Sequence, residues 1–259
     1  MLSKSLTAFN NKDFEKIRRD SSPKKEFAVK FLIVSEGKET EKLYFQAFEG
    51  KSLRNASITT VCKGIGQSPL HVVETAIRLK NQAVDNKTPF ESVWAVFDHD
   101  DFTEDQWNEA ISLGERNQVR CAWSNQAFEL WYILHFENRS VYTHRTEHEA
   151  IINTHLGKHI PGFAYDKADP NMLRYLDLYG DELAAVRWAK AKMVQFWRAG
   201  IPSYHRNPCT TVYRLVNVLR GGDWKFNEKI KLLIKKQANQ IDKDAFSKKQ
   251  LKAFKRTAS

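Results

Sequence analysis

The sequence predicts an α/β fold in which helices flank a mostly parallel sheet and a helical extension follows toward the C-terminus. Two observations carry this prediction. Apolar, β-branched runs alternate with amphipathic helical patterns from residue 27 to residue 123, and the pattern after Asn125 is almost entirely helical. Strands that alternate with helices at this spacing are joined by right-handed crossovers, which place the strands parallel.

The first half contains four predicted strands and three predicted helices. The strands are Phe27–Ser35, Ile58–Lys63, Ser92–Phe97 and Val119–Trp123, and the helices are Lys38–Phe48, Pro69–Ala83 and a segment from Thr103 to about Arg116. Ser68 is a good N-cap residue, and Pro69 follows it at a position where the missing N–H is not needed. Thr103 and Gln106 have the spacing of a capping box, so a helix is expected to start there.

Helices dominate the sequence after residue 125. The expected segments are Ala127–Phe136, Glu147–Leu156, Met172–Tyr179, Glu182–Arg198, Thr210–Leu219 and a lysine-rich stretch from Lys225. In Glu182–Arg198, an apolar stripe that includes Leu183, Val186 and Ala189 predicts a packing helix, with Trp188 outside the stripe.

Positive charge is concentrated at the two ends of the chain. The 259 residues carry a net charge of +10, of which +4 lies in residues 1–30 and +8 in residues 225–259, so the segment between them carries −2. Basic ends can grip a polyanion, because phosphate neutralisation supplies most non-specific affinity for nucleic acid. An equal alternative is that these lysines lie on a solvated helix and serve only solubility.

The composition also bears on the cellular compartment. The apolar runs are too short for a membrane span and the N-terminus has no signal-peptide core, so we expect a cytoplasmic protein without membrane association. Cys62, Cys121 and Cys209 are odd in number and lack metal-ligand spacing. We expect reduced, buried thiols, with a catalytic thiol as the open alternative.

Two acidic clusters directly follow predicted strands. Glu36 comes after the first strand, and Asp98, Asp100 and Asp101 come after the third. Open α/β sheets bind ligands at the carboxyl ends of their strands, and carboxylates gathered there repel one another unless a proton or a cation takes up the charge. A Mg²⁺ site is therefore predicted. The alternative is that these acids solvate a loop or cap the next helix.

Such a site suits the hydrolysis of a phosphodiester. Two Mg²⁺ ions about 4 Å apart can activate water, stabilise the phosphoryl oxygens and assist the leaving alkoxide. Asp98 and Asp100 point the same way if the strand remains extended, and Glu36 completes the site or acts as general base. Lys38 and Lys63 lie near the same edge, where they contact phosphate or remain solvated.

Two further groups of polar residues leave alternatives open. Ser124 and Asn125 follow the fourth strand. Three roles stay open for them: to orient the metal site, to contact a phosphate, or to cap the next helix. Four histidines are spaced 4, 7 and 4 residues apart: His144, His148, His155 and His159. They suit zinc only if one helix continues through all of them, and otherwise they are polar surface residues.

Four sequence blocks together resemble the RloB family. They are FLIVSEGKETEKLYF at residues 31–45, WAVFDHDDF at 94–102, WSNQAFELWYILHF at 123–136 and NPCTTVYRLVNVL at 207–219. The resemblance implies a Toprim-like metal-binding core at residues 26–136, completed by helices at 137–222, with a basic extension at 1–25 and a basic tail or helix at 223–259. It also implies that Glu36, Asp98 and Asp100 hold the metal, and it adds Glu41 and Glu129 as candidate ligands.

The function that the resemblance implies is a Toprim-like nuclease that uses Mg²⁺ or Mn²⁺ in bacterial defence against phage. RNA, including tRNA, and DNA both stay open as the substrate. The implied partner is an ATPase of the ABC or AAA class, and homo-oligomerisation stays open. The alternative is a nucleic-acid-binding or regulatory subunit that keeps the fold without cutting. Intact carboxylates favour the enzyme, since a pure binder has no need to maintain their mutual repulsion.

Overall fold

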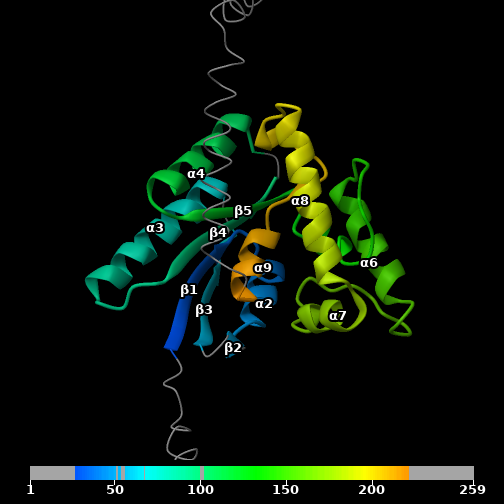
Figure 1. Ribbon diagram of the computed structural model, residues 1–259, viewed down its shortest axis with the longest axis horizontal. Helices are drawn as coiled ribbons and strands as arrows, with labels where there is room; N and C mark the ends of the chain where they lie inside the picture. The colour runs from blue at the N-terminus through cyan, green and yellow to red at the C-terminus, as the bar shows by residue number, and fades with distance from the viewer. Residues whose placement is uncertain (1–26, 51, 54–55, 67, 100–101, 222–259) are drawn as a thin grey trace, which may run out of the picture. The chain divides into compact units, whose positions relative to one another are not determined.

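The computed structural model describes residues 27–50, 52–53, 56–66, 68–99 and 102–221 (Figure 1). One compact unit ends at Leu215, and a second unit begins at Val216. The predicted α/β core and the helical segment after it therefore belong to one unit as far as Leu215. The predicted basic extensions, 1–25 and 223–259, lie outside the described residues.

The first unit is built on a six-stranded sheet with the strand order β2-β3-β1-β4-β5-β6. The strands are β1 (Phe27–Ser35), β2 (Ser52–Leu53), β3 (Ala56–Gly64), β4 (Ser92–Asp98), β5 (Arg120–Asn125) and β6 (Cys209–Thr210). The four predicted strands, β1, β3, β4 and β5, are confirmed and pair in parallel. β2 and β6 add short antiparallel pairs. The chain thus has the mostly parallel, helix-flanked sheet of a Toprim-like fold.

Each helix predicted between residues 38 and 219 has a counterpart. The α-helices of the described residues are α2 (Thr40–Gln46), α3 (Pro69–Asp85), α4 (Glu104–Arg116), α5 (Glu129–Ile133), α6 (His148–Leu156), α7 (Met172–Tyr179), α8 (Glu182–Arg198) and α9 (Tyr213–Leu219). The capping box at Thr103 is confirmed: Gln106 N donates to Thr103 Oγ1 (3.3 Å), and Thr103 N donates to Gln106 Oε1 (3.0 Å).

Two predicted helix boundaries were wrong. The segment from Ala127 to Phe136 was predicted as one helix, but only α5 within it is a regular α-helix. At both ends of the segment, backbone N–H groups donate to the carbonyl oxygen three residues earlier, as in a 3₁₀ turn. Thr210 was predicted to start a helix, but it lies in β6 and pairs with Ser124 of β5. The helix α9 begins only at Tyr213. A two-residue strand has no alternating pattern long enough to be recognised in the sequence.

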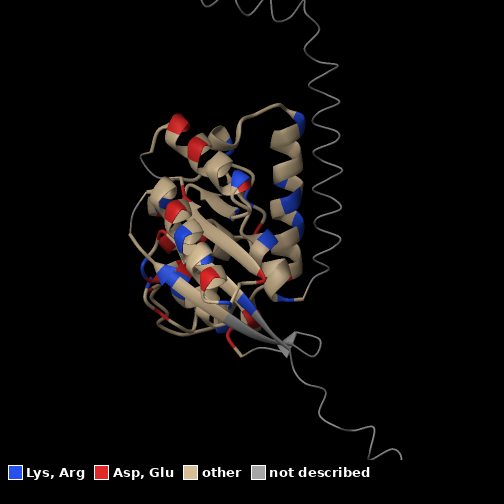
Figure 2. Ribbon diagram, turned by 90° about the vertical axis from the view of Figure 1, so that its left-hand side faces the viewer, with Lys and Arg blue, Asp and Glu red and all other residues tan. Residues whose placement is uncertain are grey.

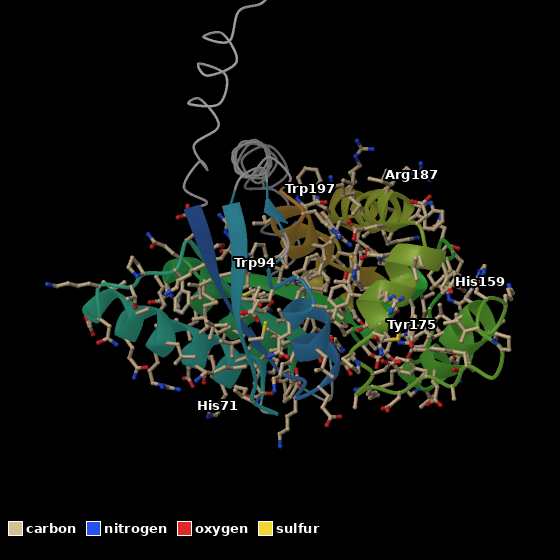
Figure 3. All side chains as sticks on the ribbon, turned by 90° about the horizontal axis from the view of Figure 1, so that it is seen from below. His71, Trp94, His159, Tyr175, Arg187 and Trp197 are labelled. Carbon is tan, nitrogen blue, oxygen red and sulfur yellow. The ribbon has the colours of Figure 1, made fainter. Side chains whose placement is uncertain are left out.

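The sheet separates two apolar layers. On one face, Leu32 and Val34 of β1 pack in a core that contains Val72 of α3 and Trp107 of α4. Alternation along the strand turns the buried Ile33 to the other face. The aromatic side chains of α2 and α5 pack against one another, with Tyr44, Phe45, Phe128 and Tyr132 in mutual contact. Figure 3 shows α2 and α3 on opposite sides of β1 and β3.

The packing face of α8 is rotated from the predicted stripe. Ala189 of the stripe is buried as expected, but Leu183 is 82% exposed, and Ala184 and Ala185, which lie outside the stripe, are buried. Trp188, expected outside the stripe, is half-buried. Small side chains let a helix approach its neighbours closely, so a stripe weighted by large apolar residues placed the centre of the packing face too far toward Leu183.

Charged side chains of both signs occupy the outer faces of α3 and α4, which Figure 2 shows toward the viewer. Exposed examples are Glu74 and Arg78 of α3 and Glu109 of α4. This surface is mixed in sign, as expected for helices that only cover the core. Within the described residues, none of the helices has the length and apolar character needed to cross a bilayer.

Candidate metal centre

The strand order creates a crevice at the carboxyl ends of β1 and β4. β3 lies on one side of β1 and β4 on the other, and the helices that follow β1 and β4 cover opposite faces of the sheet. Such a reversal of strand order is where open α/β sheets place their ligands. Glu36 directly follows β1 and Asp98 ends β4, and Asp98 N donates to Glu36 Oε2 at 3.2 Å. The predicted neighbourhood of these two acids is confirmed.

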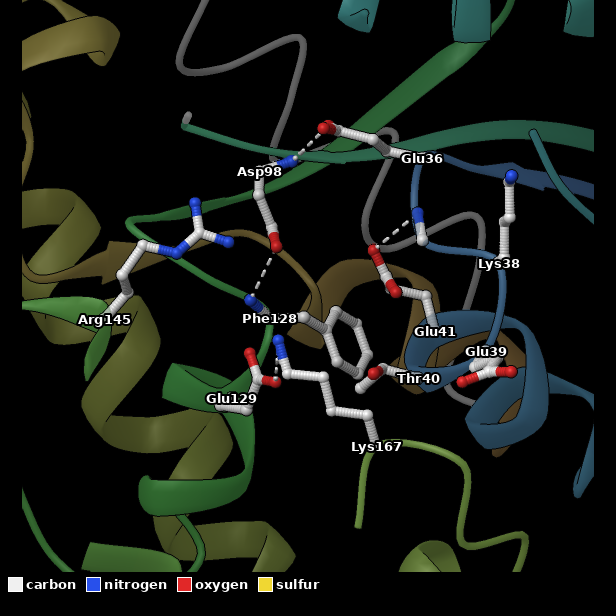
Figure 4. A pocket seen from close by; sticks show the side chains of 11 residues that line it. Glu36, Lys38, Glu39, Thr40, Glu41, Asp98, Phe128, Glu129, Arg145 and Lys167 are labelled. Carbon is white, nitrogen blue, oxygen red and sulfur yellow. Dashed lines mark hydrogen bonds and ion pairs between the residues drawn. The ribbon is translucent and has the colours of Figure 1, made fainter. Parts of the chain in front are cut away.

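Five carboxylates line a pocket of about 420 Å³ at this crevice (Figure 4). Glu39 is exposed, and we call the four that are buried or half-buried, Glu36, Glu41, Asp98 and Glu129, the acidic cluster. Two of them follow strands, Glu41 lies in the first turn of α2, and Glu129 lies in the first turn of α5. The sheet and the helices directly after its strands therefore supply every member of the cluster.

Backbone groups fix the orientation of two of these carboxylates. Asp98 Oδ2 accepts a hydrogen bond from Phe128 N at 3.0 Å, whereas its buried Oδ1 has no hydrogen-bond partner among the described residues. Glu41 Oε1 accepts from Gly37 N at 3.1 Å. A Cβ at residue 37 would overlap the Glu41 carboxylate, so only glycine leaves room for this arrangement.

Burial and mutual repulsion raise the pKa of three of these acids. Burial, opposed by the bond from Asp98 N, raises the pKa of Glu36 to about 7, with a further rise from the charge of Glu41. Burial and then the charge of Glu129 raise the pKa of Glu41 to about 7. Burial, followed by the charges of its acidic neighbours, puts the pKa of Asp98 well above its ordinary value. The negative charge of the pocket is therefore poorly compensated by the protein.

Glu129 differs from the other three because it already has partners. Tyr165 OH donates to Glu129 Oε1 at 3.0 Å, and Lys167 Nζ lies 3.8 Å from the same oxygen. Both residues belong to the connection between α6 and α7. The carboxylate of Glu129 thus links the acidic cluster to the helical half of the chain, residues 137–215.

The donor set suits a hard divalent cation. All four acidic side chains offer oxygen, which Mg²⁺ and Mn²⁺ prefer, and the unpartnered Asp98 Oδ1 is a ready ligand. In the part of the chain that the structure describes, no three His, Cys, Asp or Glu side chains converge closely enough to surround an ion directly. Mg²⁺ retains several waters and needs only one or two direct carboxylates, so the pocket fits an ion held partly through water.

The other predicted site residues fall into three groups. Lys38 lines the pocket, whereas Lys63 is exposed at the end of β3 and does not. Ser124 and Asn125 are buried: Ser124 Oγ pairs with Thr210 Oγ1 (2.9 Å), and Asn125 Nδ2 donates to Tyr204 O (2.9 Å). They join the end of β5 to the segment around β6 and do not line the pocket, and their contact with nucleic acid stays a prediction. Asp100 lies outside the described residues.

The four histidines do not form a common site. His144 caps the 3₁₀ turn Arg145–Glu147, and His148 is buried in α6. His155 stacks on Phe136, and His159 stacks on Tyr179. Figure 3 shows His159 at the outer surface. Each ring contacts a different part of the helical half, because the helix does not continue through all four residues.

None of the three cysteines forms a disulfide with another described residue. Burial raises the pKa of both Cys62 and Cys209 to about 12. A thiol with such a high pKa is a poor nucleophile at neutral pH, which favours inert side chains at these two positions. The expected burial holds for Cys209, whereas Cys62 and Cys121 are half-buried.

Three residues that reach the site from the helical region after β5 were not predicted from the sequence. Arg145 and Lys167 line the pocket, and Tyr165 bonds to Glu129. They come from the 3₁₀ turn before α6 and from the α6–α7 connection, far from any strand end. No local pattern distinguishes them from ordinary surface residues, since only the tertiary packing brings them to the sheet edge.

The sheet and its acidic crevice define a Toprim-like α/β protein with a candidate divalent-cation site. Comparison with protein families gives a match to the family described as RloB-like protein over residues 31–219. The chain therefore belongs to the RloB-like family, which confirms the resemblance found in the sequence blocks. Comparisons with curated proteins and with solved structures gave no match.

Proposed function

We propose that this RloB-like protein is a Mg²⁺- or Mn²⁺-dependent nuclease that hydrolyses phosphodiesters in RNA or DNA. The observation that carries this proposal is the acidic cluster at the strand crossover, with Asp98 Oδ1 buried and unpartnered inside it. Buried carboxylates of raised pKa without compensation are costly, and their retention favours a site that acts on a cation-bound substrate.

The chain's own groups suit hydrolysis. Phe128 N holds Asp98 in place, and Gly37 N holds Glu41, so the donors are ordered before any ligand enters. Glu36, with its pKa near 7 and one oxygen bonded to Asp98 N, is suited to accept the proton of an attacking water through its other oxygen. A bound divalent cation would supply Lewis-acid stabilisation of the phosphoryl oxygens.

The biological setting of the proposal comes from the family resemblance. We propose that the protein acts in bacterial defence against phage, in the cytoplasm, together with an ATPase of the ABC or AAA class. Glu36 and Asp98 are taken as catalytic, Asp100 joins them by motif, and Glu41 lies in the same pocket. A nucleic-acid-binding or regulatory subunit of the same complex is the outcome expected if binding occurs without cleavage.

The test is incubation of the purified chain with plasmid DNA, single-stranded DNA and tRNA, in Mg²⁺, Mn²⁺ or EDTA, with and without the candidate ATPase. Cleavage should require the divalent ion and disappear when Glu36→Gln is combined with Asp98→Asn. Glu109→Gln, an exposed acid of α4, serves as the matched control and should cut normally. Cleavage that survives the double substitution would refute this site, and binding without cleavage under every condition would favour the regulatory subunit.

A further inference from the structure

The exposed residues that line the pocket are three cations, Lys38, Arg145 and Lys167, and one acid, Glu39. Arg145 and Lys167 both line the pocket, and Figure 4 shows Arg145 beside Asp98 and Lys167 beside Glu129. Both residues are exposed, and the Lys167 side chain retains 64% of its accessible surface. We call these two residues the cationic wall. A ligand entering the pocket would meet the wall and the acidic cluster together.

The backbone that carries Arg145 is fixed to the strand end. Arg145 N donates to Gln126 Oε1 at 2.8 Å, and Gln126 directly follows β5. The 3₁₀ turn is closed by a capping box between His144 and Glu147. The guanidinium therefore extends from an ordered turn, which lowers the entropy that a ligand contact would cost.

Lys167 is held through the acidic cluster itself. Its Nζ lies 3.8 Å from Glu129 Oε1, the oxygen that also accepts from Tyr165 OH. Tyr165 N in turn donates to Asn153 Oδ1 of α6 at 2.6 Å, and Ala168 N donates to Asp166 Oδ1 at 2.9 Å. Glu129 is thus engaged by the connection that presents Lys167, and it has less freedom than Asp98 to bind an ion.

The charges on the two sides select the chemistry of the ligand. An acidic cluster alone would attract any cation, and a cationic wall alone would attract any anion. A phosphate that arrives with a divalent ion satisfies both sides at once. Guanidinium groups match phosphate oxygens with a planar pair of donors, and lysine adds a point charge.

We infer that Arg145 and Lys167 form a binding site for backbone phosphates of a nucleic-acid strand, and that Glu129 positions this wall through Lys167 and Tyr165. This inference rests on the proposed function and specifies how its substrate is held. Glu129 is a positioning residue here, whereas Glu36, Glu41 and Asp98 remain for the ion.

Oligonucleotide binding tests the cationic wall without requiring cleavage. Fluorescence anisotropy of a 5′-fluorescein-labelled 20-nucleotide single strand, titrated in Ca²⁺ buffer over a range of salt, gives the Kd and its salt slope. Arg145→Gln and Lys167→Gln should each weaken binding roughly tenfold, the size of one charge-assisted contact. Each should also reduce the salt slope by about 0.7, the value for one phosphate contact on a single strand.

Matched variants separate a specific wall from general positive charge. Lys158→Gln removes an exposed lysine near the end of α6 that does not line the pocket, and it should change neither value. Lys167→Arg should restore most of the affinity lost in Lys167→Gln. Unchanged affinity and slope in both Gln variants, or no oligonucleotide binding by the unaltered protein, would overturn the inference.

Calorimetry with Mg²⁺ tests the role of Glu129. Glu129→Gln and Tyr165→Phe should weaken oligonucleotide binding and leave the Mg²⁺ affinity within about twofold of the unaltered protein, whereas Asp98→Asn should lower it about tenfold or more. Circular dichroism melting checks that each variant is folded. A loss of Mg²⁺ affinity in Glu129→Gln equal to that in Asp98→Asn would make Glu129 a ligand.

These results are independent of the nuclease test. A protein that never cleaves, but whose wall variants lose oligonucleotide affinity, refutes the proposed activity and retains the phosphate site. A protein that cleaves in a Glu36-dependent manner, with unchanged affinity in the wall variants, retains the activity and loses the phosphate site.

Discussion

The sheet half of the chain, residues 27–136, contributes all the carboxylates of the pocket and one lysine, whereas the helical half, residues 137–215, contributes two cations. The sheet half supplies the acidic cluster at the ends of β1 and β4 and in the helices that follow strands. The helical half supplies Arg145 and Lys167 from irregular segments. The strand ends fix where an ion could bind. The connections between helices carry the cations that a phosphate-containing ligand would contact.

The largest expected effect separates these two contributions in steady-state kinetics. Asp98→Asn should lower kcat at least about 100-fold with little change in KM, because it alters the groups that act on the reacting phosphate. Lys167→Gln should mainly raise KM, since the lysine contacts substrate before and during reaction alike. Initial rates over a range of labelled oligonucleotide concentrations give both constants. Equal changes of kcat in the two variants would contradict the assignment of catalysis to the sheet half and of substrate binding to the helical half.

The sequence predicted the sheet half better than the helical half for a physical reason. Parallel strands are buried on both faces, so β1 and β4 appear as continuous apolar runs whose ends can be located. Glu36 and Asp98 were recognised because they directly follow such runs. Glu41 and Glu129 needed the family resemblance, since an acid in the first turn of a helix is common.

The helical half had no comparable signal. Arg145 and Lys167 lie in connections whose path depends on tertiary packing, and no periodic pattern marks a pocket residue there. The exposed Leu183 and the buried Ala184 of α8 show the same limit, because helix packing depended on side-chain size as well as on hydrophobicity. Ser124 was assigned to the site from its position after a strand, yet its partner Thr210 is 86 residues away in the chain.

A second prediction examines how closely the acidic cluster is packed. Gly37→Ala should displace the Glu41 carboxylate and break its bond from Gly37 N, because the new Cβ would occupy the same space. We expect Mg²⁺ affinity to fall roughly 10- to 100-fold, as is typical when groups that orient ligands are lost. Calorimetry measures the affinity. Gly162→Ala in the helical half has open space but a φ of +74°, so it should cost stability without changing Mg²⁺ affinity.

A third prediction uses the raised pKa values of the cluster. Glu36 and Glu41 have a pKa of about 7 in the folded protein against an ordinary value of 4.5, so their protonated forms favour folding. This stability is fully present below pH 4.5 and is lost as the pH rises through 7. Thermal melts in EDTA should therefore show a Tm that falls by several degrees between pH 4.5 and pH 8.

The ion and the charge-removing variants should reverse that loss. Mg²⁺ added at pH 8 should raise the Tm, since it binds the folded state. Asp98→Asn should flatten the pH profile in EDTA by removing one of the repelling charges, and Glu109→Gln on α4 should leave the profile unchanged. A Tm that rises with pH across this range would contradict this prediction. It would mean that other groups of the protein neutralise the negative charge of the acidic cluster.

The smallest expected effect tests whether the two halves fold together. Thr103 caps α4 in the sheet half, and Asp181 Oδ1 accepts from Ala184 N at 2.8 Å to cap α8 in the helical half. Replacing either residue by Ala should cost about 0.5–2 kcal/mol, which in a protein of this size lowers the Tm by about 2–4 °C per kcal/mol. If the halves form one cooperative unit, both substitutions shift the same single calorimetric transition. Two transitions, with Asp181→Ala moving only one of them, would mean that the wall can unfold while the acidic cluster stays in place.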